Sequence, residues 1–241
     1  MLFAAGLGTR LRPLTDTMPK AMVPVDGRPL IEIVTKHLIS QGATEIIVNV
    51  HHFGQQIIDF IAQHSWPIPI RISDERDALL NTGGGLRKAQ SLFTDDGEPI
   101  LIHNVDILSN APLADFYREN ASHDATLMVS QRDTQRYLLF DDDMRLRGWT
   151  NIATGEVRSP FADIVPEKLH RYAFSGIHLF SPRLFSLMEH YPTAFPIMDF
   201  YLEQCAKADI RGHVQDNLKL MDVGKLNTLH EAEHFVKDLG L

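Results

Sequence analysis

The feature that most constrains the fold of this chain is an alternation of apolar runs with helical segments through its first hundred residues. The apolar runs have the length of buried strands and cover residues 1–5, 45–50, 68–72 and 99–103. The segments between them carry apolar residues at helical spacing and cover residues 29–39, 55–63 and 85–93. Strands that alternate with helices in this way predict an α/β fold of the Rossmann-like, doubly wound type with a mostly parallel sheet.

The later part of the chain has a different pattern. Two short runs flank the acidic turn Asp141-Asp142-Asp143 and predict a β-hairpin. Further strands are predicted at 125–130, 171–180, 210–214 and 219–223, and helices at 182–190, 199–208 and 226–239. Because no linker, repeat or low-complexity tract separates the two parts, we predict one domain over residues 1–241, made of a first half, 1–110, and a second half, 111–241.

Charge and composition exclude several classes of function. The net charge of −8 leaves no basic footprint for a nucleic acid. No apolar run reaches the ~18 residues that a membrane span needs, and no basic region precedes an apolar stretch at the N-terminus, so neither a membrane anchor nor a signal peptide is expected. The single cysteine, Cys205, cannot form a disulfide within the chain, and we therefore expect a reducing, cytoplasmic location.

A glycine-rich segment directly follows the first apolar run. Residues 1–5 are short for a central strand, so we expect that strand to begin a few residues upstream. The segment Ala5-Gly6-Leu7-Gly8-Thr9-Arg10 lets backbone N–H groups approach a phosphate without a Cβ in the way. Arg10 can bind phosphate oxygens through its planar guanidinium, and Lys20, at the end of the next loop, can reach the same anion. The segment is neither a P-loop nor a dinucleotide fingerprint, because the motifs of both are incomplete.

Two aspartates at the ends of predicted strands are candidate metal ligands. Asp106 follows the run at 99–103, and Asp222 ends the run that begins at 219. Ligands of open α/β sheets gather at the carboxyl ends of the strands, and carboxylates there can hold Mg²⁺ against phosphates. The Asp141-x-Asp143 spacing is a rival acidic site of the kind that sugar-transferring enzymes carry, but consecutive residues in a turn cannot all face one ion.

The stretch from Ala4 to Pro29, AAGLGTRLRPLTDTMPKAMVPVDGRP, resembles the signature of the sugar-phosphate nucleotidyltransferases. Segments later in the chain are similar to the same family: Thr82-Gly83-Gly84-Gly85, Asn104-x-Asp106, Phe174-Ser175-Gly176-Ile177 and Asp222-Val223-Gly224. The resemblance covers almost the whole chain and implies the nucleotide-diphospho-sugar transferase fold. It also implies transfer of a nucleotidyl group from an NTP to a sugar 1-phosphate with Mg²⁺ as cofactor, the first half binding the nucleotide and the second half the sugar.

The resemblance also implies roles for individual residues. It gives catalytic roles to Arg10, Lys20 and Asp106, and the metal to Asp106 and Asp222. The predicted nucleotide-binding residues are Ala5, Gly6, Gly8, Thr9, Arg10, Lys20, Thr82, Gly83 and Asn104. For the sugar we select Gly176, inside a strand segment that the family uses for this purpose, and Asn151, for which an ordinary loop asparagine is the alternative. Val105 stands where the family usually has glycine, and it would be strained if the backbone there needed a positive φ.

The substrate pair stays open at this point. The strongest resemblance is to small bacterial members without a C-terminal β-helix and favours UTP with N-acetylmuramate 1-phosphate. Guanylyltransferases that act on mannose or heptose 1-phosphate, and cholinephosphate cytidylyltransferases, share the signature. A non-catalytic subunit that binds nucleotide sugars is a further alternative, against which the intact Arg10, Lys20, Asp106 and Asp222 argue. We expect a monomer or a homodimer.

Overall fold

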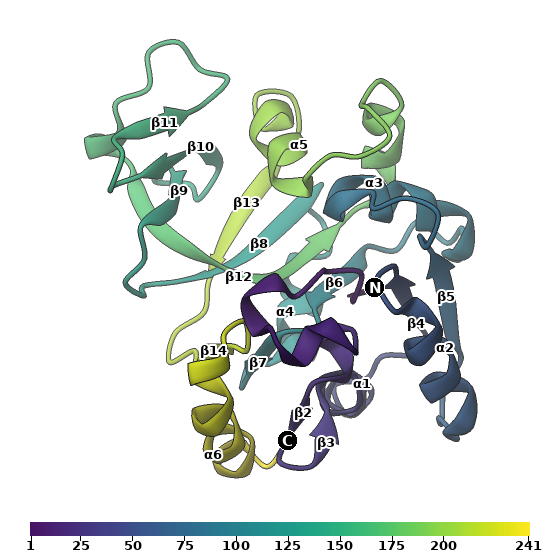
Figure 1. Cartoon of the computed structure of the whole chain (residues 1–241). Helices are drawn as coiled ribbons and strands as arrows, with labels where there is room; N and C mark the ends of the chain where they lie inside the picture. The colour runs from purple at the N-terminus through teal and green to yellow at the C-terminus, as the bar shows by residue number, and fades with distance from the viewer.

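The computed structural model describes all 241 residues and places a mixed sheet at the centre of the molecule (Figure 1). The parallel part of this sheet consists of β1 (Leu2–Phe3), β4 (Ile46–Val50), β5 (Ile70–Asp74) and β6 (Ile100–Asn104), in the order β6-β1-β4-β5. The helices between these strands are α1 (Leu30–Ser40), α2 (Gly54–Gln63) and α3 (Asn81–Lys88). The predicted α/β fold with a doubly wound, parallel arrangement is confirmed.

The second half extends the same sheet to ten strands. Its additional strands are β8 (Ala125–Ser130), β9 (Arg136–Phe140), β10 (Leu146–Asn151), β11 (Glu156–Arg158), β12 (His170–Phe180) and β13 (Ile210–Val214). The long strand β12 runs antiparallel to β6, β8 and β9 and therefore joins the two halves. Strands β9 and β10 form the predicted hairpin, in which the Asp141 carboxylate accepts hydrogen bonds from the backbone N–H groups of Asp143 and Arg145.

Several short elements escaped prediction. They are α4 (Leu113–Asn120), the strand pair β2 (Pro24–Val25) with β3 (Arg28–Pro29), and β7 (Ile107–Ser109). The partner of β7 is β14 (Leu220–Asp222), which lies within the run predicted at 219–223. The remaining helices are α5 (Ile197–Gln204) and α6 (Leu229–Leu239). The helix predicted at 182–190 is a 3₁₀-helix over Pro182–Met188.

The extent predicted for the third helix is wrong. It begins at Asn81 rather than after the glycines, so residues 83–85 lie inside its first turns. The backbone N–H groups of Gly83 and Gly84 both donate to the Phe195 carbonyl, over 2.8 and 3.2 Å. A Cβ on Gly83 would lie 2.5 Å from Cδ2 of Phe195. Gly83 and Gly84 are therefore required by close packing against the segment before α5, and Gly85 by its approach to Glu75 and Asn49.

Side chains that alternate along the strands divide the core between two faces of the sheet. On β1, Leu2 belongs to a cluster of 28 buried residues beneath α1, α2 and α6. Its neighbour Phe3 points the other way, into a cluster of 23 beneath α3 and α5. All five residues of β4 are buried, as expected for a strand covered on both faces. None of the helices is both long enough and apolar enough to cross a lipid bilayer.

Two buried histidines lie on the paired strands β6 and β12, where His103 is the register partner of Ile177 and His178, the next residue, points to the opposite face of the sheet. Each is 1% exposed. Burial lowers the pKa of His103 to about 4 and that of His178 to about 3. In the unfolded chain a histidine titrates near ~6.5. The unfolded state therefore binds more protons between these pH values, and folding stability is lost as the pH falls below about 6.5.

We expect His178→Phe to weaken this acid sensitivity, because the rings of Phe3, Phe174 and Tyr201 already surround the His178 ring. The fall in unfolding free energy between pH 7 and pH 5 should be smaller in the variant by about 2 kcal/mol, as one histidine contributes up to about 1.4 kcal/mol per pH unit. Urea denaturation at both pH values measures the difference. The exposed His230 supplies the control substitution, and an unchanged pH dependence in His178→Phe would contradict the assignment.

Candidate active site

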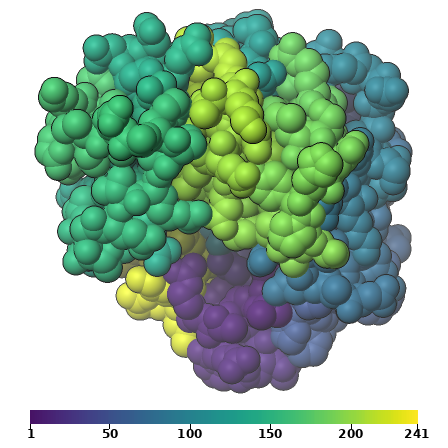
Figure 2. Space-filling model, turned by 90° about the horizontal axis from the view of Figure 1, so that it is seen from above, coloured from purple at the N-terminus to yellow at the C-terminus, as the bar shows by residue number.

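A cavity of about 430 Å³ opens at the carboxyl ends of β1 and β6 and at the start of α3. It is lined by all but one of the predicted nucleotide-binding residues: Ala5, Gly6, Gly8, Thr9, Arg10, Lys20, Thr82 and Asn104. The exception is Gly83, which is buried against Phe195. Figure 2 shows the purple N-terminal segment meeting the green and teal segments of the second half. Residues far apart in the sequence therefore form one concave site.

The glycine-rich segment is a tight loop that closes back on the chain after it. Gly8 has a φ of 64°, and a Cβ there would lie 2.8 Å from Cγ2 of Thr15 and 3.0 Å from Cβ of Lys20. The Thr15 hydroxyl donates to the Gly8 carbonyl over 2.8 Å. Three short 3₁₀ turns follow, over Thr9–Leu11, Leu14–Asp16 and Lys20–Met22. The loop therefore brings Lys20 against the segment that carries the candidate phosphate-binding N–H groups.

A buried polar pair that the sequence analysis missed supports this loop. Asn49 on β4 accepts the backbone N–H of Ala4 over 2.7 Å and donates to the Glu75 carboxylate over 2.8 Å. Glu75 has no exposed surface, and burial raises its pKa although the Asn49 bond opposes the shift. Both residues line the cavity. The only available signal was their position, at or just beyond the carboxyl ends of β4 and β5.

The two predicted metal ligands lie on neighbouring segments. Asp222 ends β14 and is the register partner of Ile107 on β7. One residue further, the Val223 N–H donates to the Asp106 carbonyl over 2.8 Å. This antiparallel pairing places Asp106 and Asp222 at the same edge, although more than a hundred residues separate them in the sequence.

Each aspartate has a basic partner from the N-terminal segment. Lys20 is 8% exposed and its ammonium contacts the Asp106 carboxylate directly. Arg10 lies 3.9 Å from Asp222, with both side chains about half exposed, so this pair adds little to stability. The site thus combines two carboxylates with two cations: Arg10, Lys20 and Asp106 line the cavity, and Asp222 is paired with Arg10.

This donor set fits Mg²⁺. Nowhere in the chain do three or more acidic, histidine or cysteine side chains group as a metal cage. Mg²⁺ is usually held by one or two carboxylates together with substrate phosphates and water, so the pair formed by Asp106 and Asp222 is sufficient. These two residues would hold the ion.

The strain that a positive φ would cause at Val105 does not arise. Its φ is not positive, and its side chain is 4% exposed in the larger core cluster. The positive φ occurs instead at Gly176, at 77°, where a Cβ would lie 2.8 Å from Nδ2 of Asn104. Gly176 therefore backs Asn104 rather than lining a cavity. Asn151 does not line the cavity, and its side-chain oxygen accepts the backbone N–H of Ala153 in a turn.

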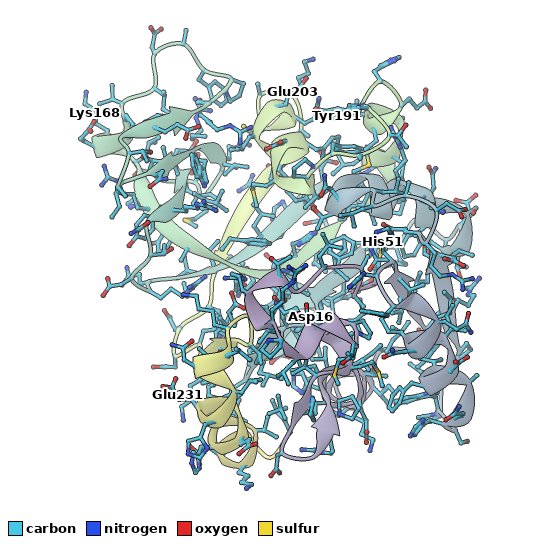
Figure 3. All side chains as sticks on the ribbon, viewed as in Figure 1. Asp16, His51, Lys168, Tyr191, Glu203 and Glu231 are labelled. Carbon is cyan, nitrogen blue, oxygen red and sulfur yellow. The ribbon has the colours of Figure 1, made fainter.

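A second cavity of about 350 Å³ adjoins the first. The two share Phe3, Thr82, Asn104 and Pro196. The second extends toward the hairpin, where Arg132, Arg136, Trp149 and His178 also line it. Lys168 lines a separate cavity beside Arg147, and Figure 3 shows it at the outer end of the hairpin region, away from Asp16 in the N-terminal segment.

Comparison with known proteins identifies the fold. The structure resembles that of HddC from Yersinia pseudotuberculosis complexed with GMP-PN, with a TM-score of 0.76 at 20% identity over 97% of both chains. It also resembles UDP-glucose pyrophosphorylase from Acinetobacter baumanii, with a TM-score of 0.76 at 19% identity over 98% of this chain and 91% of the other. These neighbours have the nucleotide-diphospho-sugar transferase fold that the sequence implied.

Curated relatives of two kinds are similar in sequence. Mannose-1-phosphate guanyltransferase of Pichia angusta is 28% identical over 208 residues, which cover 82% of this chain and 55% of the relative. N-acetylmuramate alpha-1-phosphate uridylyltransferase of Caulobacter vibrioides is 39% identical over 109 residues, 44% of each chain. The chain thus spans about half the length of the guanyltransferases that it matches, 55% in the case of the Pichia enzyme.

The profile of one protein family covers nearly the whole chain. Residues 1–238 match the family described as nucleotidyl transferase. The matched range includes the glycine loop, Lys20, Asp106 and Asp222. The chain therefore belongs to the nucleotidyl transferase family.

Proposed function

We propose that this chain is an enzyme that transfers a nucleotidyl group from an NTP to a sugar 1-phosphate, giving an NDP-sugar and pyrophosphate. The observation that carries the proposal is the cavity in which the glycine loop, Lys20 and Asp106 meet, with a second cavity continuing beyond Asn104. The first cavity would hold the NTP, chiefly through residues 1–110, and the second would hold the sugar, chiefly through residues 111–241. A cytoplasmic location is part of the proposal, and the single cysteine, which cannot form a disulfide within the chain, supports it.

The proposed reaction is an in-line displacement. An oxygen of the sugar 1-phosphate forms a bond to the α-phosphorus of the NTP, and the bond from that phosphorus to the bridging oxygen breaks. Its electron pair leaves with pyrophosphate. The attacking phosphate is already ionised at neutral pH, so no general base is needed, and catalysis depends on positioning and on charge neutralisation.

The residues of the chain supply both requirements. Backbone N–H groups from Gly6 to Arg10 would bind phosphate oxygens. Lys20 and Arg10 would offset the negative charge that develops on the leaving pyrophosphate. Mg²⁺, held by Asp106 and Asp222, would withdraw electron density from the phosphoryl oxygens that it binds.

For the substrates we propose UTP and N-acetylmuramate 1-phosphate. The support is the 39% identity to the Caulobacter uridylyltransferase, which exceeds the identity to the guanyltransferases. GTP with mannose 1-phosphate is the second candidate, because the match to the guanyltransferases covers 82% of this chain rather than 44%.

Pyrophosphate release tests the proposal directly. The full chain is incubated with Mg²⁺, each of the four common NTPs, and either N-acetylmuramate 1-phosphate or mannose 1-phosphate. We expect the highest kcat/KM with UTP and N-acetylmuramate 1-phosphate, and loss of turnover with EDTA that added Mg²⁺ restores. A preference for GTP with mannose 1-phosphate would favour the second candidate, and no pyrophosphate with any pair would overturn the proposed activity.

A further inference from the structure

The second cavity contains two arginines that no motif of the sequence accounts for. Arg132 lies in the segment between β8 and β9, and Arg136 is the first residue of β9. Both line the cavity, on the side of the hairpin. The cavity therefore carries two full positive charges, although the whole chain has a net charge of −8.

Neither arginine has an acidic partner. Arg132 donates to the backbone carbonyl of Phe174 over 3.0 Å, and Arg136 makes no side-chain hydrogen bond or ion pair. Most arginines of this chain are instead paired with carboxylates, as Arg158 is with Asp199 over 2.9 Å. Both residues are exposed, and two cations that line one cavity without a carboxylate partner suit an anionic ligand, which arginine binds through its planar guanidinium.

The position of the pair indicates which anion this is. Lys20, Asp106 and the glycine loop line only the first cavity, whereas Arg132 and Arg136 line only the second. The reacting phosphates belong with Lys20 and Asp106, on the other side of the shared residue Asn104. An anion at the arginines is therefore a different substituent, carried by the sugar itself.

Other groups in the second cavity suit a sugar ring. Trp149 offers an aromatic surface, and His178 is 1% exposed with neither ring nitrogen hydrogen-bonded. A neutral imidazole offers one donor and one acceptor, which a hydroxyl or amide of the sugar can satisfy. The cavity thus combines a site for a neutral polar ring with a site for a separate anion.

We propose that Arg132 and Arg136 bind a carboxylate on the sugar and make the enzyme selective for acidic sugar 1-phosphates. This inference rests on the proposed function and deepens it. N-acetylmuramate 1-phosphate carries such a carboxylate on its lactyl ether. N-acetylglucosamine 1-phosphate lacks only that lactyl group and is the matched neutral substrate.

The test compares these two sugars in steady-state kinetics on the full chain and on Arg132→Gln, Arg136→Gln and the double variant. Loss of a charge-assisted hydrogen bond should raise KM for the acidic sugar about 10- to 100-fold in each single variant. KM for N-acetylglucosamine 1-phosphate should not change. Lysine in place of either arginine should restore part of the affinity, because it keeps the charge but loses the planar fork.

Arg171→Gln is the matched control, since Arg171 on β12 lines neither cavity, and it should leave both sugars unaffected. Equal rises in KM for both sugars would overturn the inference, because the arginines would then bind the 1-phosphate. Unchanged values for both sugars would overturn it as well. Calorimetry measures binding of the two sugar 1-phosphates without turnover, so it distinguishes failure of this inference from failure of the proposed function. A chain without catalytic activity should still bind the acidic sugar more tightly than the neutral one. The double variant should lose that preference.

Discussion

Asp106→Asn should lower kcat by at least about 10²- to 10³-fold while the chain stays folded. The substitution keeps the shape of the side chain and removes its charge. It takes one of two carboxylates from the candidate Mg²⁺ site, and only Asp222 remains to hold the ion. The loss should appear mainly in kcat, because neutralisation of charge on the reacting phosphates matters most in the transition state.

Pyrophosphate release at saturating substrates measures this effect, and far-UV circular dichroism with urea denaturation checks the fold. Asp143→Asn is the matched control, because Asp143 lies in the β9–β10 turn, away from both cavities. Near-normal turnover in Asp106→Asn would show that this carboxylate has no part in the chemistry. If a higher Mg²⁺ concentration restored turnover, the defect would lie in metal affinity, and this result would support the assignment.

The part of the site that could be predicted from sequence is the part encoded in contiguous segments. The glycine loop and Arg10 are consecutive, and Lys20 follows within ten residues, so their types and spacing specify a phosphate cradle before any folding is considered. Asp106 could also be predicted from the sequence, because a carboxylate that follows a buried strand lies at the ligand-binding edge of a parallel sheet. All of these residues line the first cavity.

What could not be predicted depends on pairings between distant segments. Asn49 and Glu75 meet because the parallel strands β4 and β5 place Val50 opposite Asp74. No local sequence pattern predicts the hydrogen bond between Asn49 and Glu75. Strand β14 falls within the run predicted at 219–223, but its partner β7 has only three residues, too few to show a period, so the pairing that brings Asp222 to Asp106 could not be predicted. The side-chain oxygen of Asn151 accepts a backbone N–H within its own turn, so this local hydrogen bond takes the place of a contact with a ligand.

The third helix shows the opposite failure, in which a correct local rule gave the wrong boundary. Consecutive glycines usually precede a helix rather than occupy its first turns, because glycine is costly in a helix interior. Here a Cβ on Gly83 would meet Phe195, one on Gly84 would meet the segment before Phe195, and one on Gly85 would meet Glu75, so tertiary packing overrides the local preference. The same packing fixes Thr82, whose hydroxyl accepts the N–H of Ile197 over 2.9 Å at the wall shared by the two cavities.

Lys20→Met should lower kcat/KM by about 10²- to 10³-fold, with KM for the NTP raised. Methionine preserves much of the length and packing of the side chain, so the change is mainly one of charge. A unit charge about 4 Å from another contributes about 4 kcal/mol at an effective dielectric constant of ~20, which corresponds to roughly a thousandfold in rate or affinity. Lys20 is placed to exert such an effect, since it is 8% exposed, lines the cavity and contacts Asp106.

The competing explanation is that Lys20 serves only as the structural partner of Asp106. In that case Lys20→Met would lower the unfolding free energy through the unpaired carboxylate, but the folded enzyme would keep its KM for the NTP. Measuring both quantities separates the two roles. Lys36→Met is the matched control, because Lys36 also pairs with a carboxylate, Glu32, but on the exposed surface of α1. An unchanged KM with near-normal kcat in folded Lys20→Met would contradict a role for Lys20 in binding the triphosphate. A raised KM together with a lower kcat would mean that its ammonium binds the phosphates in both the ground state and the transition state.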